Sequence, residues 1–374
     1  MRVMILENDA WCADLLKQIV LSIRPGVQVD RFTRVQNAIE AWQLAPYQLV
    51  LTEWNLSDAT GINLLKNIRR EDRRTPVVIV TGHSDRASVL AVRTLGVNAF
   101  ITKPFQVPRV IEYLAKLIPQ PDAATNSPLL GEDLIAYLAG KDAGELDMPL
   151  IGNVREQLLS CLKGEEQDLR ELAESWRHDP ALCAKLIAVA NSSAYNNGGR
   201  PCLNHIEALR KLGVQTCLNL AMGMALRQYT EQASPLLELK IQSQLDEIER
   251  LSDRTLALSR QCRIDPAPLH TAALLHRMGE LCVLHLTQIW ENSGYIIDDN
   301  QIMQGIAEFS GPFAISLKAH WGLPMPLREL IGAVYVLPPA QVRREQVVMR
   351  LAAAELQGEE LSTIERLKRL AGLA

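Results

Sequence analysis

Polar residues suited to phosphoryl transfer follow four short apolar runs in the first third of the chain. They are Glu7, Asn8, Glu53, Thr81 and Lys103. Acidic side chains that bind Mg²⁺, a carboxylate that accepts the phosphoryl group, a hydroxyl and a lysine are the groups this reaction uses. If the runs are parallel strands, these residues meet beyond the carboxyl ends of the strands, where open sheets bind ligands.

Three histidines in the second half of the chain invite a metal-site interpretation: His270, His276 and His285. On a single helix, His270 and His276 would lie roughly 120° apart at 100° per residue. A zinc-binding pair on one helix is normally spaced i, i+4. We therefore expect no metal site from these histidines without ligands from other helices.

The apolar runs alternate with amphipathic stretches up to about residue 117, which predicts an α/β fold with a five-stranded, doubly wound parallel sheet. The predicted strands are residues 3–6, 27–32, 49–52, 77–80 and 99–101. Residues 118–128 are rich in Pro, Ala, Asn and Ser and indicate a linker. Beyond the linker the apolar residues recur at helical spacing, so an all-α domain follows. The predicted organisation is 1–118 for the first domain, 119–144 for a linker with a first helix, and 145–374 for the helical domain.

Helix boundaries in the second domain are marked by sequence signals. Asp179-Pro180 and Asp265-Pro266 each place a capping carboxylate before a proline suited to the first helical turn. After Pro338-Pro339, residues 342–356 and 361–370 have helical periodicity and are expected to cap the domain.

Composition narrows the class of protein. The 374 residues carry a net charge of −4 with a pI near 6.0 and no long basic run, which argues against nucleic acid as a partner. The seven cysteines are scattered, odd in number and without C-x-x-C spacing, which favours reduced thiols. Neither a signal peptide nor an apolar run of membrane-spanning length is evident, so we expect a cytoplasmic protein that does not bind membranes.

Residues 1–118 resemble a response-regulator receiver domain in LVLTEWNLSDATG (49–61), VVIVTG (77–82) and AFITKPF (99–105). In that family the third strand ends in the aspartate that accepts phosphate from a histidine kinase, and Glu53 stands at that position. Asn8 stands where the family has a metal-binding carboxylate. The resemblance implies that Thr81 and Lys103 would contact the phosphoryl group.

Two consequences follow from this resemblance. The longer side chain of Glu53 and the amide of Asn8 make phosphorylation doubtful, and only weak Mg²⁺ binding is expected. Either Glu53 pairs with Lys103 and holds the switch in an active-like state, or the pocket is inert. Phe100 would be the rotating aromatic residue of the switch, and Lys103-Pro104 would be a cis peptide.

The region from about 145 to 340 resembles the HDOD family, relatives of the HD-type metal-dependent phosphohydrolases. The matching stretches are HDPALCAKLIAVANSSAY (178–195), NHIEALRKLGVQTCLNLAM (204–222), AALLHRMGEL (272–281) and HWGLP (320–324). Catalytic relatives have an aspartate directly after the histidine that corresponds to His276, where this chain has Arg277. Leu251, Ser310 and the pair Val334-Tyr335 stand at other metal-ligand positions, so no metal and no catalytic residue are expected.

Six residues belong to the signature of the HDOD family: Asp179, Asn191, Ser192, Tyr195, Gly213 and Trp321. We interpret them as helix ends, turns and core, because such positions more often serve the fold than a ligand.

The sequence therefore predicts a non-enzymatic signalling regulator that acts through protein–protein contacts. The resemblances imply histidine kinases, diguanylate cyclases or phosphodiesterase proteins as partners and no required cofactor, and they leave a homodimer open. Two alternatives remain: an HD-type metal-dependent phosphohydrolase, and a conventional phosphorylatable response regulator.

Overall fold

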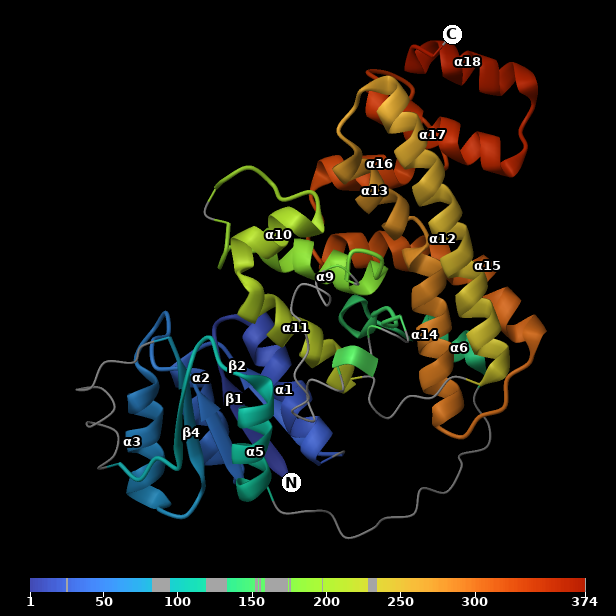
Figure 1. Cartoon of the computed structure of the whole chain (residues 1–374). Coiled ribbons are helices and arrows are strands. Elements are labelled where there is room, and N and C mark those ends of the chain that lie inside the picture. Colours follow the sequence, from blue (N-terminus) through green and yellow to red (C-terminus); the bar gives the residue numbers. More distant parts are fainter. Residues whose placement is uncertain are drawn as a thin grey trace. The chain divides into compact units, whose positions relative to one another are not determined.

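A computed structural model describes residues 1–24, 26–82, 95–118, 133–151, 154, 156–158, 174, 176–196, 198–227 and 234–373. The chain divides into two compact units, shown in Figure 1. The first comprises Met1–Thr125, Glu156–Gln167 and Val214–Tyr229, and the second comprises Asn126–Arg155, Asp168–Gly213 and Thr230–Ala374.

The first unit is built on a five-stranded parallel sheet in the order β2-β1-β3-β4-β5. The strands are β1 (Arg2–Leu6), β2 (Gln28–Phe32), β3 (Leu49–Thr52), β4 (Val77–Thr81) and β5 (Ala99–Thr102). In register, Leu6 pairs with Thr52 and Thr81 with Thr102. The carboxyl ends of the central strands are therefore level, and the predicted fold class is confirmed.

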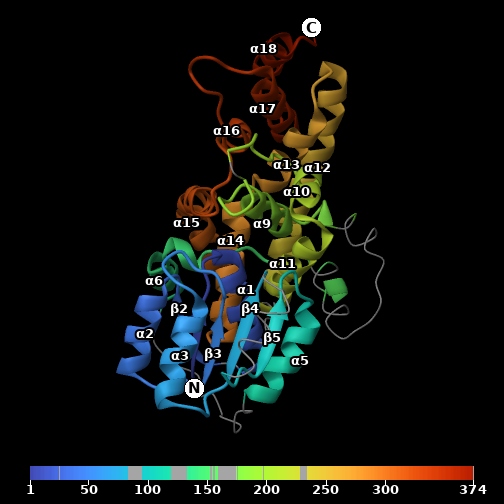
Figure 2. The same cartoon turned by 90° about the vertical axis from the view of Figure 1, so that its left-hand side faces the viewer.

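Helices cover both faces of this sheet. They are α1 (Ala10–Ile23), α2 (Val35–Leu44), α3 (Gly61–Glu71) and α5 (Val107–Leu117). Helices α1 and α5 pack together, as do α2 and α3, on opposite faces of the sheet (Figure 2). The helix expected between β4 and β5 falls on residues 83–94, outside the described residues.

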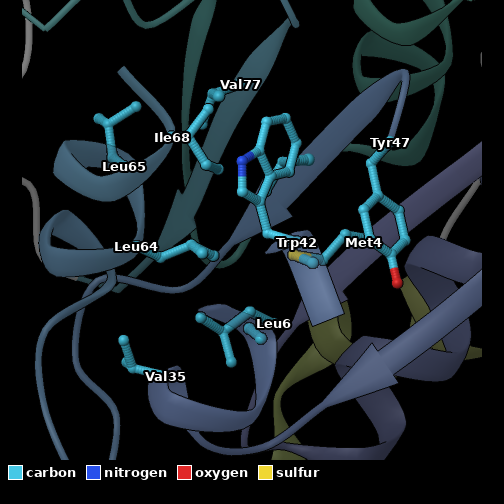
Figure 3. Close-up of a cluster of buried hydrophobic side chains, with 11 residues drawn as sticks. Met4, Leu6, Val35, Trp42, Tyr47, Leu64, Leu65, Ile68 and Val77 are labelled. Carbon is cyan, nitrogen blue, oxygen red and sulfur yellow. The ribbon is translucent and has the colours of Figure 1, made fainter. Parts of the chain in front are cut away.

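A buried apolar cluster joins the sheet to α2 and α3 (Figure 3). Strand residues alternate across the sheet, so one set of side chains from β1, β3 and β4 faces these helices. The fully buried members are Met4, Leu6, Ala38, Val50, Leu64, Leu65, Ile68 and Val77, and Val35, Trp42 and Tyr47 are nearly so. The cluster fixes the strands whose ends carry the polar residues.

Helix α11 (Val214–Arg227) also belongs to the first unit, although the sequence assigns its residues to the helical domain. It packs against α1 and α5. A Cβ added at Gly223 would lie 2.6 Å from Leu15 Cδ1, so the missing side chain permits close approach. The Asn219 side-chain amide donates a 2.6 Å hydrogen bond to the carbonyl oxygen of Phe105.

The described part of the second unit is mostly helical, as predicted. Its helices are α6 (Leu134–Ala139), the 3₁₀ helix η1 (Ala143–Glu145), α9 (Pro180–Ala190), α10 (His205–Leu212), α12 (Pro235–Cys262), α13 (Pro266–Leu275), α14 (Met278–Asn292), α15 (Asp299–His320), α16 (Met325–Ala333), α17 (Arg344–Gln357) and α18 (Leu361–Ala371). Helices α17 and α18 match the two predicted C-terminal stretches to within two residues. None of the helices among the described residues combines the length and apolar content needed to cross a membrane.

Both predicted N-caps are present. The Asp265 side chain accepts from the Ala267 amide at 3.0 Å, and the Asp179 side chain accepts from the Leu182 amide at 2.8 Å. The second oxygen of Asp179 accepts from the Ile151 amide at 2.8 Å. Burial raises the pKa of the Asp179 carboxyl to about 6, while these amide hydrogen bonds oppose the shift. Asp179 therefore holds the start of α9 to a segment 28 residues earlier.

Replacing the buried cap should cost much more stability than replacing the exposed one. Asp179→Ala should lower the free energy of unfolding by about 2–4 kcal/mol, because it removes a cap and leaves the Ile151 amide unsatisfied. Asp265→Ala, the matched control, should cost about 1 kcal/mol. Urea unfolding followed by circular dichroism measures both, and equal losses would contradict the role of Asp179 in joining the two segments.

Candidate functional site

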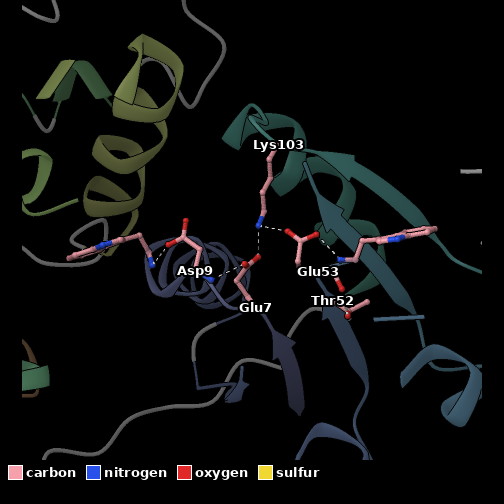
Figure 4. A network of polar contacts seen from close by, with 7 residues as sticks. Glu7, Asp9, Thr52, Glu53 and Lys103 are labelled. Carbon is pink, nitrogen blue, oxygen red and sulfur yellow. Dashed lines mark hydrogen bonds and ion pairs between the residues drawn. The ribbon is translucent and has the colours of Figure 1, made fainter. Parts of the chain in front are cut away.

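An ion-pair network lies at the carboxyl edge of the sheet in the first unit (Figure 4). The Lys103 ammonium contacts Glu7 Oε2 at 2.6 Å and Glu53 Oε2 at 2.7 Å. Glu7 follows β1, Glu53 follows β3 and Lys103 follows β5, so the strand register brings them together. Glu7 is 2% exposed and Glu53 8%, so both carboxylates are largely removed from water.

The other oxygens of these carboxylates also have partners. Glu7 Oε1 accepts from the Asp9 amide at 3.0 Å, and Glu53 Oε1 accepts from the Trp54 amide at 2.6 Å. The Thr52 hydroxyl donates to the main-chain carbonyl of Glu53 at 3.0 Å. The Glu53 side chain is thus fixed on both sides, by a backbone amide and by an ammonium.

The ionisation of the network follows from burial and charge. Burial raises the pKa of Glu7, although Lys103 opposes the shift. Burial would lower the pKa of Lys103, but the surrounding Cys12, Glu7 and Glu53 raise it well above its ordinary value. Lys103 therefore stays cationic at any physiological pH and neutralises one of the two carboxylate charges.

The remaining residues of the predicted phosphoacceptor pocket have varied positions. Thr81 is buried at the end of β4, where its carbonyl accepts from the Lys103 amide at 2.8 Å. Asn8 is exposed. Phe100 is half-buried in β5, with its ring edge-on to Trp54 at 6.4 Å between centroids. The Lys103-Pro104 peptide is cis, as predicted. The pairing of Glu7 with Lys103 was not predicted, because Glu7 had been interpreted as a metal ligand.

A second polar site lies in the other unit, around His276 and Arg277. These residues separate α13 from α14: His270 lies in α13, His285 lies in α14 and His276 lies between them, so the comparison of the three on a single helix was wrong. A cavity of about 230 Å³ is lined by Glu247, Arg250, Leu251, His276, Arg277, Val334, Tyr335, Ala353, Leu356 and Gln357. The fold thus assembles most of the positions at which the resemblance places metal ligands. Ser310, on α15, does not line this cavity.

Arg277 supplies a fixed cation at this site. Its guanidinium pairs with Glu280 at 2.8 Å and also with Glu247. His276 is 6% exposed, its Nδ1–H donates to the Ala273 carbonyl at 2.7 Å, and the Tyr335 hydroxyl donates to the His276 carbonyl at 2.6 Å. Burial lowers the pKa of His276 to about 4, so the imidazole is neutral near pH 7.

The Arg277–Glu280 pair has i, i+3 spacing within one turn, and this signal in the sequence was available but not used. Among the described residues, no group of three or more His, Cys, Asp or Glu side chains is arranged to hold a metal ion.

Comparison with known families agrees with this architecture. Residues 3–115 match the response regulator receiver domain, and residues 148–336, just over half of the chain, match the HDOD domain. The chain belongs to the HDOD family. Its HDOD domain follows a receiver domain, and together they define a response regulator with an HDOD output domain.

Two named relatives match about a third of the chain, and a solved structure matches more of it. The transcriptional regulatory protein FixJ of Bradyrhizobium diazoefficiens is 27% identical over 135 residues, which are 36% of this chain and 65% of FixJ. Chemotaxis protein CheY-3 of Vibrio cholerae is 26% identical over 31% of this chain and 91% of its own length. The crystal structure of the MmoQ response regulator from Methylococcus capsulatus is 17% identical, covers 61% of this chain and 92% of that chain, and has a TM-score of 0.45.

In the HDOD domain, Asn191 ties a helix end to a loop. It ends α9, its amide donates to the Cys202 carbonyl at 2.9 Å, and its oxygen accepts from the Cys202 amide at 2.8 Å. The Ser192 hydroxyl donates to the Val189 carbonyl at 2.8 Å, and the half-buried Tyr195 lies in the turn that follows. These contacts shape the chain after α9.

The other signature residues of the HDOD domain also have structural positions. Gly213 ends α10 with a φ of 77°, a backbone conformation that residues other than glycine rarely adopt. Trp321 is buried at the end of α15, and the Lys185 ammonium lies 5.2 Å from its ring centroid.

Removing the Arg277 cation should destabilise the HDOD domain. Arg277→Met leaves Glu247 and Glu280 without their shared partner and should lower the free energy of unfolding by about 1–3 kcal/mol, since all three side chains are partly exposed. Lys240→Met, which breaks a more exposed pair with Asp299, should cost at most about 1 kcal/mol. Chemical denaturation tests both, and an Arg277→Met variant as stable as the wild type would refute the proposed charge balance.

Proposed function

We propose that this response regulator transmits its signal through protein–protein contacts, without phosphorylation of its receiver domain and without enzymatic activity of its HDOD domain. The observation that carries the proposal is the pairing of Lys103 with Glu53 and Glu7. A phosphoryl group would have to compete with both carboxylates for this lysine.

The geometry of Glu53 supports a receiver that is not phosphorylated. Its two side-chain oxygens are held by Lys103 and by the Trp54 amide, and one methylene more than in aspartate displaces the carboxylate by roughly 1 Å, an error that near-attack geometry tolerates poorly. Asn8 adds no charge for Mg²⁺, and Asp9 accepts from the Trp11 amide at 3.0 Å as the N-cap of α1.

In this proposal the pocket has one fixed state. Glu53 contributes one negative charge to Lys103, whereas a phosphoryl group carries roughly two. The carboxylate therefore imitates phosphate only in part, and the receiver would respond to binding partners rather than to a phosphodonor.

In this proposal, helix α11 links the receiver pocket to the HDOD domain. Residues 214–227 lie within the stretch that matches the HDOD domain, yet α11 packs on α1 and α5 of the receiver. Asn219 binds the carbonyl of Phe105, two residues beyond Lys103. A partner that shifts the β5–α5 connection would therefore disturb an HDOD helix directly. Histidine kinases, diguanylate cyclases and phosphodiesterase proteins are the proposed classes of partner.

The alternative of a metal-dependent phosphohydrolase needs a divalent ion beside His276. The Arg277 guanidinium, paired with Glu247 and Glu280, lies at that position and would repel the ion. Stoichiometric metal in the purified protein would favour this alternative over the proposal.

Phosphorylation can be tested by intact mass. The wild type, Glu53→Asp and the double variant Asn8→Asp/Glu53→Asp are incubated with Mg²⁺ and acetyl phosphate. We expect no added phosphoryl group on the wild type, because Glu53 is held by Lys103 and Trp54, and labelling of the double variant, which restores both family residues.

Omission of Mg²⁺ is the control in this experiment and should abolish labelling of the double variant. A phosphoryl group on the wild type that disappears in Glu53→Gln would overturn the proposal and restore a conventional response regulator.

A further inference from the structure

A large cavity in the second unit is separate from the His276–Arg277 site. It has a volume of about 980 Å³, lies between α10, α12 and α13 beside the turn that precedes α9, and shares no lining residue with the smaller cavity. Pockets for small organic ligands typically span roughly 300–1,000 Å³, so this cavity is large enough for one.

Three histidines line this cavity: His178, His205 and His270. The rings of His178 and His270 lie edge to face, with centroids 6.3 Å apart. Arg177 Nε donates to His178 Nε2 at 2.8 Å, which keeps that imidazole neutral. Burial and the neighbouring His270 together lower the pKa of His205 to about 4, and burial also lowers the pKa of His270, so these imidazoles are neutral near pH 7.

Two helices begin at this cavity, α10 at His205 and α13 at Pro266. The first turn of α13 offers no amide to a ligand, because Pro266 and Pro268 lack an N–H and the Ala267 amide is bonded to Asp265. In α10, Asn204 caps the Glu207 amide, so the amides of its first two residues and the partial positive charge of the helix start are what favour an anion.

The wall of this cavity also contains a buried hydroxyl. Ser252 lines the cavity, is 5% exposed, and its Oγ makes no hydrogen bond with any described residue. A buried hydroxyl without a partner costs about 1–3 kcal/mol, and a ligand that offers it a hydrogen bond would recover this cost.

The remaining wall combines apolar surface with a few charges. The apolar part comes from Ile151, Val154, Leu245, Ile248, Leu256 and Leu274. The charged residues are Glu174, Arg177, Glu249, Asp253 and Arg260, of which Glu174 and Arg177 pair with each other. This wall therefore suits an apolar, ring-sized body, and its carboxylates leave the start of α10, beside His205 and His270, as the place for an anionic group.

We propose that this cavity binds a small organic phosphate of mononucleotide size. The phosphate lies against His205, His270 and the first turn of α10, the body lies on the apolar wall, and Ser252 hydrogen-bonds to the ligand. Because three carboxylates and two guanidinium groups line the cavity, a phosphate gains most when imidazoles become protonated. Binding therefore takes up protons and strengthens as the pH falls from 8 towards 6.

Isothermal titration calorimetry of the full chain with AMP, GMP, CMP and UMP, at pH 8 and pH 6, tests this proposal. At least one nucleotide should bind saturably and about tenfold more tightly at pH 6. At pH 6, loss of one charge-assisted hydrogen bond should make His205→Gln bind about tenfold more weakly. Ser252→Ala should bind severalfold more weakly, whereas the exposed control His320→Gln should bind like the wild type.

Several outcomes would overturn the proposal. They are the absence of saturable binding by all four nucleotides at millimolar concentration, equal affinity for a nucleoside and its monophosphate, and equal effects of His205→Gln and His320→Gln. Thermal unfolding of each variant identifies any that fails to fold, and Ser252→Ala then carries the test alone. Tight binding of Zn²⁺ that displaces the nucleotide would also refute the assignment, because it would make the histidines a metal site.

Discussion

Two buried carboxylates at one edge of the sheet require a neutralising cation, and the structure of the receiver pocket depends on the residue that supplies this cation. Parallel strands of equal register bring Glu7 and Glu53 to the same edge, where burial makes an unpaired negative charge costly. Lys103, which follows β5, meets both carboxylates within hydrogen-bond distance. The position of Lys103 in turn sets the course of the chain through Phe105, whose carbonyl holds Asn219 of α11.

In the HDOD domain, too, two carboxylates are neutralised by one cation. Glu247 from α12 and Glu280 from α14 converge beside His276, and the guanidinium of Arg277 neutralises both. In each domain a cation from the chain itself is bound between two carboxylates. Unlike a metal ion or a phosphoryl group, such a cation cannot leave, so both pockets are suited to a fixed structural state. Changes in such a protein would come from its surfaces and from other ligands, which supports the proposal that it acts through contacts with partners.

Local signals in the sequence predicted much of this structure. Alternating apolar runs predicted the positions and ends of the strands along the chain, and thereby the common sheet edge at which Glu53 and Lys103 lie, while Asp-Pro pairs predicted the starts of α9 and α13. Contacts between segments distant in sequence were not predictable in this way. The packing of α11 on the receiver depends on Gly223 facing Leu15, and the pairing of Arg277 with Glu247 spans 30 residues. Likewise, His178, His205 and His270 come from three segments, and their spacing along the chain does not reveal a common cavity.

The central claim is that Lys103 and Glu53 occupy the receiver pocket, so that it needs no Mg²⁺. The Trp54 amide reports on this directly, because it donates to Glu53 Oε1. A titration of the ¹⁵N-labelled protein with Mg²⁺, followed by the ¹H–¹⁵N resonance of Trp54, is therefore the most direct test. The account predicts no saturable shift up to about 10 mM Mg²⁺ in the wild type, and a saturable shift in Asn8→Asp/Glu53→Asp, where acidic oxygens for the ion are restored. A saturable shift in the wild type at submillimolar Mg²⁺ would show that the ion enters the pocket and would contradict the account.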